Sequence, residues 1–433
     1  MALLEALATG SCAALPSLPI PAPCGSKVAP LLPVALAAFP LIALLFPGRS
    51  FALAFGLYVV LVPVDAMLIP GSHTSLTKLT GLFVIATALW TIVRRRAALR
   101  VPSPVFFWLA VVTLMAVSTL WAIDVNASLH ELPTIISAFA LFALVAIVPV
   151  DREDFRGIVI ATIASGVVAG VLAIAQRHEL QAAAGLDRLA VTLGTATIDP
   201  NQFAAALLLP VAITVTAIFR TSYRYWLLLV PSLALMLTAV YFTASRGAAL
   251  ALVAMAIVAI LASRRRVLWS ALLAIAVAGV IFIPNELASR IATSRLMAGS
   301  GRIDIWRVAV SIFKEHWALG TGFANFPAAY DRAFFSAFEE HFESWHRASH
   351  SLIVSTTTEL GIAGAIVLGA ALIAQYRSLD SVQVSARDLW TRTTLRAAFV
   401  GLLVAALFLD VLTFKYSWLL FMEMLLAVRV TEA

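Results

Sequence analysis

The sequence predicts an all-α fold: a polytopic bundle of about 12 transmembrane helices with one large loop of amphipathic helices outside the membrane. Hydrophobic residues make up 62% of the 433 residues, and charged residues only 12%, about half the fraction usual in soluble proteins. Apolar runs of membrane-spanning length recur along the chain, with basic clusters between them. A water-soluble fold is excluded, because too little polar surface is available to cover it.

Thirteen apolar runs are long enough, or nearly so, to cross a bilayer. They lie near 28–46, 51–69, 79–93, 104–123, 130–150, 157–175, 202–219, 225–243, 248–263, 267–284, 351–375, 397–413 and 416–428. We expect about 12 spans with both termini in the cytoplasm, so one of the first two runs would not be a full span. The predicted parts are an N-terminal segment (1–27), transmembrane helices (28–284), an external loop (285–350) and C-terminal transmembrane helices (351–433).

Arginine clusters fall in alternate loops and set the predicted orientation, because basic residues favour the cytoplasmic side. The clusters are Arg94/Arg95/Arg96/Arg100, Arg152/Arg156, Arg220/Arg224, Arg264/Arg265/Arg266 and Arg377/Arg387/Arg392/Arg396. The loop 285–350 is therefore expected on the opposite side, which in a bacterium is the periplasm. The net charge of +7 is accounted for by these clusters and does not indicate a nucleic-acid partner.

Two stripes inside 285–350 predict amphipathic helices. The first consists of Ile305, Val308, Ala309, Ile312 and Phe313, and the second of Tyr330, Phe334, Phe335, Phe338, Phe342 and Trp345. The aromatic stripe is typical of helices that lie in the membrane interface. It is equally compatible with aromatic residues that only pack the loop onto the bundle.

The chain lacks a Walker loop, a GxGxxG motif, a nucleophile elbow and an HExxH motif, so ATP hydrolysis, dinucleotide binding, acyl-serine chemistry and zincin chemistry have no support. Arg246 lies in the tight turn Thr243–Gly247 between two apolar runs, where an isolated arginine needs an anion. Snorkelling of this side chain to lipid headgroups is the alternative. Arg302 follows a glycine-rich turn at the start of a predicted helix and either binds an anion or is an ordinary exposed residue at a helix cap.

A third glycine-rich stretch is Gly320–Phe326, and a fourth begins at His350, where the loop re-enters the membrane. A partly desolvated neutral imidazole there can accept a proton. The small residues Gly361, Ala363 and Gly364 that follow indicate close helix packing. His341, Glu343, His346 and His350 suggest a metal, but one set at helical spacing is weak evidence, and we expect no metal site and no cofactor.

Taken in order, these stretches carry a resemblance. They resemble motifs of the O-antigen ligase/polymerase superfamily. In chain order the stretches are Asp199-Pro200-Asn201-Gln202-Phe203-Ala204, Ser245-Arg246-Gly247, Gly301-Arg302…Trp306, Gly320…Gly322-Phe323…Asn325-Phe326 and His350-Ser351-x9-Gly361-x-x-Gly364. The matching stretches run over roughly residues 100–425. The form that begins at His350 is most similar to the ligases that attach O-antigen to lipid A-core.

The resemblance implies a metal-independent GT-C type glycosyltransferase of the bacterial inner membrane that acts in lipopolysaccharide biosynthesis, with its active site facing the periplasm. The donor would be an undecaprenyl-diphosphate-linked glycan and the acceptor a sugar hydroxyl of lipid A-core, with membrane lipids as surroundings. By motif position, Arg246 and Arg302 would bind the diphosphate and His350 would be the catalytic base. Asp410, near the end of the run 397–413, and Arg188 are weaker candidates, and helix packing is the alternative for Asp410.

Three other functions stay open. An O-antigen or exopolysaccharide polymerase would use the same chemistry with a second lipid-linked glycan as acceptor, and a protein O-oligosaccharyltransferase would use a protein. A transporter or flippase would explain the intramembrane charges as a translocation path. The clustering of the charges at one end, and the lack of a visible inverted repeat, argue against transport.

Overall fold

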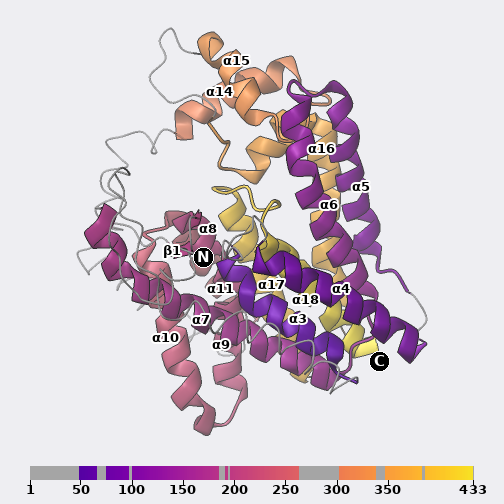
Figure 1. The fold of residues 1–433 in the computed structure, drawn as a ribbon, viewed down its shortest axis with the longest axis vertical. Helices are drawn as coiled ribbons and strands as arrows, with labels where there is room; N and C mark the ends of the chain where they lie inside the picture. Colours follow the sequence, from indigo (N-terminus) through magenta and orange to yellow (C-terminus); the bar gives the residue numbers. More distant parts are fainter. Residues whose placement is uncertain are drawn as a thin grey trace, which may run out of the picture. The chain divides into compact units, whose positions relative to one another are not determined.

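The structure is a computed structural model that describes residues 48–65, 75–96, 100–184, 191–193, 196–262, 302–337, 347–382 and 386–432 (Figure 1). Its helices are α3 (Ser50–Leu61), η1 (Val62–Val64), α4 (Leu76–Arg95), α5 (Ser103–Val117), η2 (Ser118–Trp121), α6 (Val125–Ile147), α7 (Arg152–Ala184), α8 (Pro200–Ala206), α9 (Leu208–Arg220), η3 (Tyr223–Tyr225), α10 (Trp226–Phe242), α11 (Arg246–Ala262), α14 (Arg302–Glu315), α15 (Phe326–Ala337), α16 (Leu352–Ser378), η4 (Leu379–Ser381), α17 (Ala386–Ala406) and α18 (Lys415–Glu432). The described chain is helical except for loops and a short antiparallel pair, β1 (Val191–Leu193) and β2 (Ala196–Ile198), with Thr192 opposite Thr197.

Seven helical stretches of the described residues are long and apolar enough to cross a membrane. They are Leu76–Arg95, Ser103–Trp121, Val125–Ile147, Arg152–Gln176, Pro200–Arg220, Tyr223–Phe242 and Leu352–Ser381. Two shorter apolar helices, Ser50–Val64 and Arg246–Ala262, accompany them. The runs 28–46 and 267–284 lie outside the described residues, so the structure does not test the expected count of about 12.

Two predicted runs differ from the observed helices. The run 202–219 consists of two helices, α8 and α9, that meet at Leu207. The run 397–413 contains only the second half of α17, because that helix ends at Ala406 and α18 begins at Lys415. Asp410 was expected near the end of the run 397–413, and it lies beyond the end of α17, in the loop between α17 and α18.

Buried polar contacts fix how the long helices pack in the bundle. Trp108 of α5 donates its indole N–H to Gln375 Oε1 of α16 over 3.2 Å, and Gln375 Nε2 donates to the Phe421 carbonyl of α18 over 3.2 Å. The Trp108 ring also stacks on Phe421 at 4.9 Å between centroids. A buried amide is costly without partners, so these bonds favour one register of the three helices.

Two of the predicted basic loops meet at one end of the bundle. Arg95, at the end of α4, bonds Asp154 at 3.2 Å and the Pro149 carbonyl at 3.1 Å, both beside the start of α7. Arg429 of α18 donates to the carbonyls of Ala146 and Arg100. The loop after α4 and the loop before α7, which the arginine pattern assigns to the same side, are therefore in contact.

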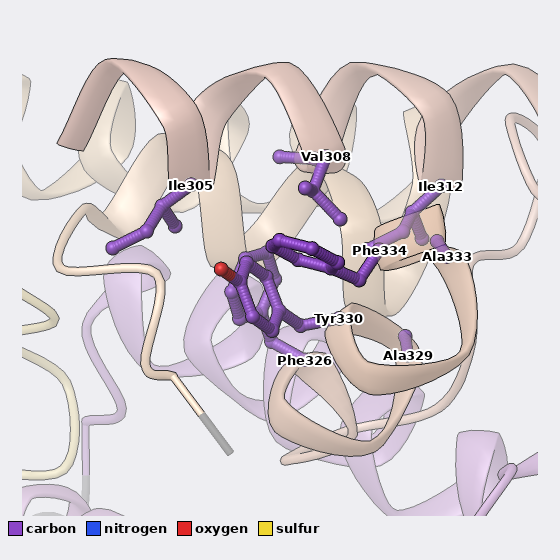
Figure 2. Close-up of a cluster of buried hydrophobic side chains, with 9 residues drawn as sticks. Ile305, Val308, Ile312, Phe326, Ala329, Tyr330, Ala333 and Phe334 are labelled. Atoms are coloured by element: carbon purple, nitrogen blue, oxygen red, sulfur yellow. The ribbon is translucent and has the colours of Figure 1, made fainter. Parts of the chain in front are cut away.

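The amphipathic helices α14 and α15 pack against each other (Figure 2). Ile305, Val308 and Ile312 point from α14 toward the rings of Tyr330 and Phe334 on α15, as Figure 2 shows, and all five side chains are buried. The predicted stripes are confirmed as helix faces over these residues. Because the described aromatic side chains fill the space between the two helices, they support packing and not lipid contact.

Candidate functional site

The loop of residues 407–414, between α17 and α18, joins the elements that carry the predicted site residues. We call it the hub loop. Its Leu409 carbonyl accepts a hydrogen bond from the Leu352 amide at the start of α16 over 3.0 Å, and its Asp410 carbonyl accepts one from Gln202 of α8 over 3.3 Å. Its Phe408 ring lies beneath the Arg302 guanidinium of α14, 5.8 Å from the centroid. Three segments far apart in sequence thus meet on one loop.

Arg246 begins α11 directly after a tight turn. Ala244 of this turn has a left-handed backbone, with φ of 50°, and Ser245 accepts a hydrogen bond from the Ala248 amide. The next residue, Gly247, faces the hub loop: a Cβ there would lie 3.3 Å from Cδ2 of Phe408. The turn therefore places half-buried Arg246 next to Gly247, which faces Phe408.

Arg302 is the first residue of α14 and is half-buried. Its guanidinium covers Phe408, the ring that a Cβ at Gly247 would touch, so the starts of α11 and α14 converge on one side chain. Contact with a ring through its face fixes the plane in which a guanidinium presents its N–H donors. The helix N-terminus adds a favourable field for negative charge.

His350 lies two residues before α16 in a strained, left-handed backbone, with φ of 50°. Ser351 fixes the helix start by accepting a hydrogen bond from the Val354 amide. Partial burial lowers the pKa of His350 below its ordinary value, and the positive charge of Arg302 lowers it further, whereas Asp199 acts in the opposite direction. The imidazole is therefore neutral at neutral pH and able to accept a proton.

Asp410 is held inside the same assembly. Its Oδ2 accepts a hydrogen bond from Ser355 Oγ of α16 over 3.2 Å. Burial raises the pKa of Asp410, while the hydrogen bonds from Ser355 and from the Leu412 amide lower it. The contact to Ser355 supports the packing interpretation of Asp410, because it joins the hub loop to α16.

The stretch Asp199–Gln202 builds the neighbouring helix start. Asp199 caps α8 by accepting from the amides of Asn201, at 2.8 Å, and Gln202, at 3.2 Å. Gln202 bonds the hub loop through the Asp410 carbonyl and accepts a hydrogen bond from the Tyr416 hydroxyl. Its side chain therefore holds α8 against the start of α18.

The Gly320–Phe326 stretch is structural. The Thr321 amide donates to the Thr358 carbonyl over 3.0 Å and the Gly322 amide to the Glu359 carbonyl over 2.8 Å. A Cβ at Gly320 would lie 2.4 Å from the Glu359 carbonyl oxygen, so only glycine permits this approach. The stretch fastens the loop between α14 and α15 to α16.

Glu359 completes this attachment, and the sequence did not single it out. Its carboxylate accepts hydrogen bonds from the amides of Ala324, at 2.9 Å, and Phe326, at 3.1 Å, just where α15 begins. The Glu359 side chain is buried, and Ala324 adopts a left-handed φ of 60° beside it. Two residues later, Gly361 interrupts α16 with φ of 64°. We refer to these contacts as the Glu359 clamp.

Four other predicted residues fall in parts of the chain that the structure does not describe. Arg188 and the residues His341, Glu343 and His346 of the weak metal hypothesis lie outside the described residues. Within the described ranges, no cluster of three or more histidine, cysteine, aspartate or glutamate residues has the geometry to hold a metal ion.

A family model described as O-antigen ligase matches residues 231–369, about a third of the chain. The matched range contains Arg246, Arg302 and His350 and ends before the hub loop. No curated protein matches the chain. The family match supports assignment to the O-antigen ligase family, whose members are glycosyltransferase-like enzymes, and the seven apolar helices fit a multi-pass membrane protein.

Proposed function

We propose that this chain, whose residues 231–369 match the O-antigen ligase family, transfers a glycan from an undecaprenyl-diphosphate-linked donor to a sugar hydroxyl of lipid A-core. One observation carries the proposal: the starts of α11 and α14, with Arg246 and Arg302, converge on Phe408 of the hub loop, and the start of α16, after His350, bonds the next residue of that loop. Two fixed cations beside one neutral base suit the transfer of a group from a diphosphate.

The arginines would bind the donor diphosphate. A guanidinium presents its N–H donors in a plane that matches phosphate oxygens, and Arg302 is oriented by the ring of Phe408. Negative charge develops on the leaving diphosphate in the transition state. Cations that are already in place stabilise this charge without reorganisation, an effect worth roughly 3–4 kcal/mol for one donor in comparable sites.

His350 would act as the base. As the acceptor hydroxyl oxygen bonds to the anomeric carbon of the donor sugar, the bond from that carbon to the diphosphate oxygen breaks. The hydroxyl proton passes to the neutral imidazole, and undecaprenyl diphosphate leaves with the bonding electron pair. A single displacement of this kind inverts the anomeric centre.

The site lies at the end of the bundle remote from the basic loops. The hub loop follows α17 and precedes α18, whereas Arg429, near the other end of α18, contacts the last turn of α6 and the carbonyl of Arg100 before α5. Because basic loops favour the cytoplasm, we propose that the site faces the periplasm across a bacterial inner membrane.

The test is turnover of a purified lipid-linked donor by the reconstituted protein. We expect Arg246→Lys and Arg302→Lys to lose most transfer, because an ammonium retains the charge and loses the planar set of donors. Arg307→Lys is the matched control, since Arg307 lies on the exposed side of α14 and bonds Asp304 at 3.6 Å. Full activity of both site variants would refute the role of the arginines.

The acceptor is tested in the same assay. Transfer to lipid A-core in preference to a second lipid-linked glycan supports the ligase. The reverse preference would replace it with a polymerase and would leave the roles of Arg246, Arg302 and His350 intact.

A further inference from the structure

The linker between α14 and α15, residues 316–325, runs alongside α16 at an unusual depth. The Trp317 carbonyl accepts a hydrogen bond from the Ile362 amide over 2.8 Å, and the Ala318 carbonyl accepts one from the Ala363 amide over 3.3 Å. These partners lie well inside the candidate span Leu352–Ser381. We propose that the linker enters the membrane boundary and that Trp317 and Leu319 contact the acyl chains of lipids there.

The length of α16 supports this depth. No charged residue separates Glu359 from Arg377, which marks the basic end of the helix. A hydrocarbon layer takes about 20 helical residues, so counting from Arg377 puts its far boundary near Thr357. Ile362, the partner of Trp317, directly follows the interruption at Gly361 and is 15 residues from Arg377, or roughly 22 Å along an unbroken helix, which is less than the roughly 30 Å of the hydrocarbon layer.

The length of the span formed by α5 and η2 independently puts the linker at the far boundary of the hydrocarbon layer. The span Ser103–Trp121 has 19 residues, which is about 29 Å of helix, and it begins just after Arg100 at the basic end. Trp121 therefore reaches the far boundary. Its indole donates to the Leu319 carbonyl over 3.2 Å, and the Ile123 amide donates to the Thr321 carbonyl over 3.1 Å. Figure 1 shows α14 at the same end of α5 and α16, in agreement with the contacts between α14 and α16.

The linker backbone is suited to an apolar medium. Irregular backbone is tolerated at membrane depth only where protein satisfies its polar groups. Three successive carbonyls, from Trp317 to Leu319, accept hydrogen bonds from α16 or η2, and three successive amides, from Gly320 to Gly322, donate to main-chain carbonyls. The linker thus meets the main requirement for entering lipid.

Apolar side chains of the linker are exposed on the protein surface, whereas its backbone is bonded to α16 and η2. Trp317 is 58% exposed and Leu319 is 50% exposed, and Leu120 of η2, next to Trp121, is 83% exposed. Ile362 and Ile366 continue this apolar surface along the span of α16. A tryptophan at the boundary with leucines beside it is the composition of a membrane-interface anchor. A lipid surface is therefore the occupant that both the depth and the side chains favour.

The test is depth-dependent quenching in the full chain, with Cys12 and Cys24 replaced by serine. Leu319→Cys and the control Arg307→Cys are each labelled with an NBD fluorophore and reconstituted into vesicles whose lipids carry a nitroxide either near the headgroup or at the chain end. We expect loss of fluorescence at position 319, stronger with the shallow nitroxide, and none at position 307.

Two results would overturn the proposal. One is equal, weak quenching at both positions, which would place the linker in water. The other is protection of position 319 from both nitroxides together with disulfide cross-linking between copies, which would make a second copy of the chain the occupant. If Leu319→Cys does not fold, Trp317→Cys replaces it in the same comparison. Neither variant touches the proposed site, so failure here leaves the proposed transferase activity unaffected.

Discussion

Loss of the Glu359 carboxylate should release the linker and α15 from α16. In Glu359→Ala, the amides of Ala324 and Phe326 lose their acceptor. Each unsatisfied buried amide costs about 1–3 kcal/mol, so the clamp should weaken by about 2–6 kcal/mol. The left-handed Ala324 backbone, which these bonds help to hold, would then relax.

Hydrogen exchange measures this effect directly. A weakening of about 2 kcal/mol accelerates exchange through local opening by about 30-fold, and larger values accelerate it more. The peptide covering 317–326 should therefore exchange at least that much faster in Glu359→Ala. Glu359→Gln retains one acceptor oxygen and should lie between this variant and the wild type.

The control is Thr357→Ala, which removes an exposed hydroxyl bonded only within α16, to the carbonyls of Ile353 and Val354. Transfer should fall together with the faster exchange in Glu359→Ala, because the clamp holds the start of α15, and α15 packs against α14, the helix that Arg302 begins. If residues 317–326 of Glu359→Ala exchanged hydrogen at the wild-type rate, the proposed role of the Glu359 clamp would be refuted. Such a result would mean that the amides of Ala324 and Phe326 find other acceptors at no cost in free energy.

Four further predictions concern the site itself. His350→Ala should lower transfer by about 10²–10⁴-fold with donor binding little changed, and near-normal transfer by His350→Gln would remove the base from the mechanism. Because the pKa of His350 is lowered in the folded protein, transfer should be lost only when the pH falls below the ordinary pKa range of histidine. Arg302→Met removes a positive charge that lowers this pKa, so the residual activity of the variant should be lost at a higher pH than that of the wild type. An unchanged pH–rate profile would contradict the effect of Arg302 on the pKa of His350. A chelator should leave donor turnover unchanged, and a strict requirement for magnesium or manganese would count against the arginine model. Arg307→Cys should react with an impermeant maleimide in intact spheroplasts, whereas labelling only after lysis would reverse the orientation.

Local patterns in the sequence predicted the helices around the site well. The stripe Ile305, Val308 and Ile312 repeats at helical spacing, and those residues form the buried face of α14. The order of basic clusters placed the starts of α11, α14 and α16 at one end, and the structure joins all three to the hub loop. Both patterns are visible because they depend on residues close together in sequence.

The hub loop and the Glu359 clamp were not predictable in this way. Residues 397–413 read as one continuous apolar run, with neither proline nor glycine after Gly401 to mark where α17 ends. The end is set by a distant partner, since the Leu409 carbonyl bonds the Leu352 amide. Likewise, Glu359 is distinguished only by the amides of Ala324 and Phe326, more than 30 residues earlier in the chain. Neither non-local bond leaves a periodic signal.

The place of the hub loop in the chain has a consequence for biosynthesis. Arg246, Arg302 and His350 are all translated before Phe408, the residue on which the starts of α11 and α14 converge. A nascent chain that has already inserted α11 and α16 still lacks this support, and α18 must follow before the loop is closed at both ends. Ribosomes that stall before residue 408 would therefore leave a membrane-inserted but inactive product, so lipid-linked donor would not be consumed by incomplete chains.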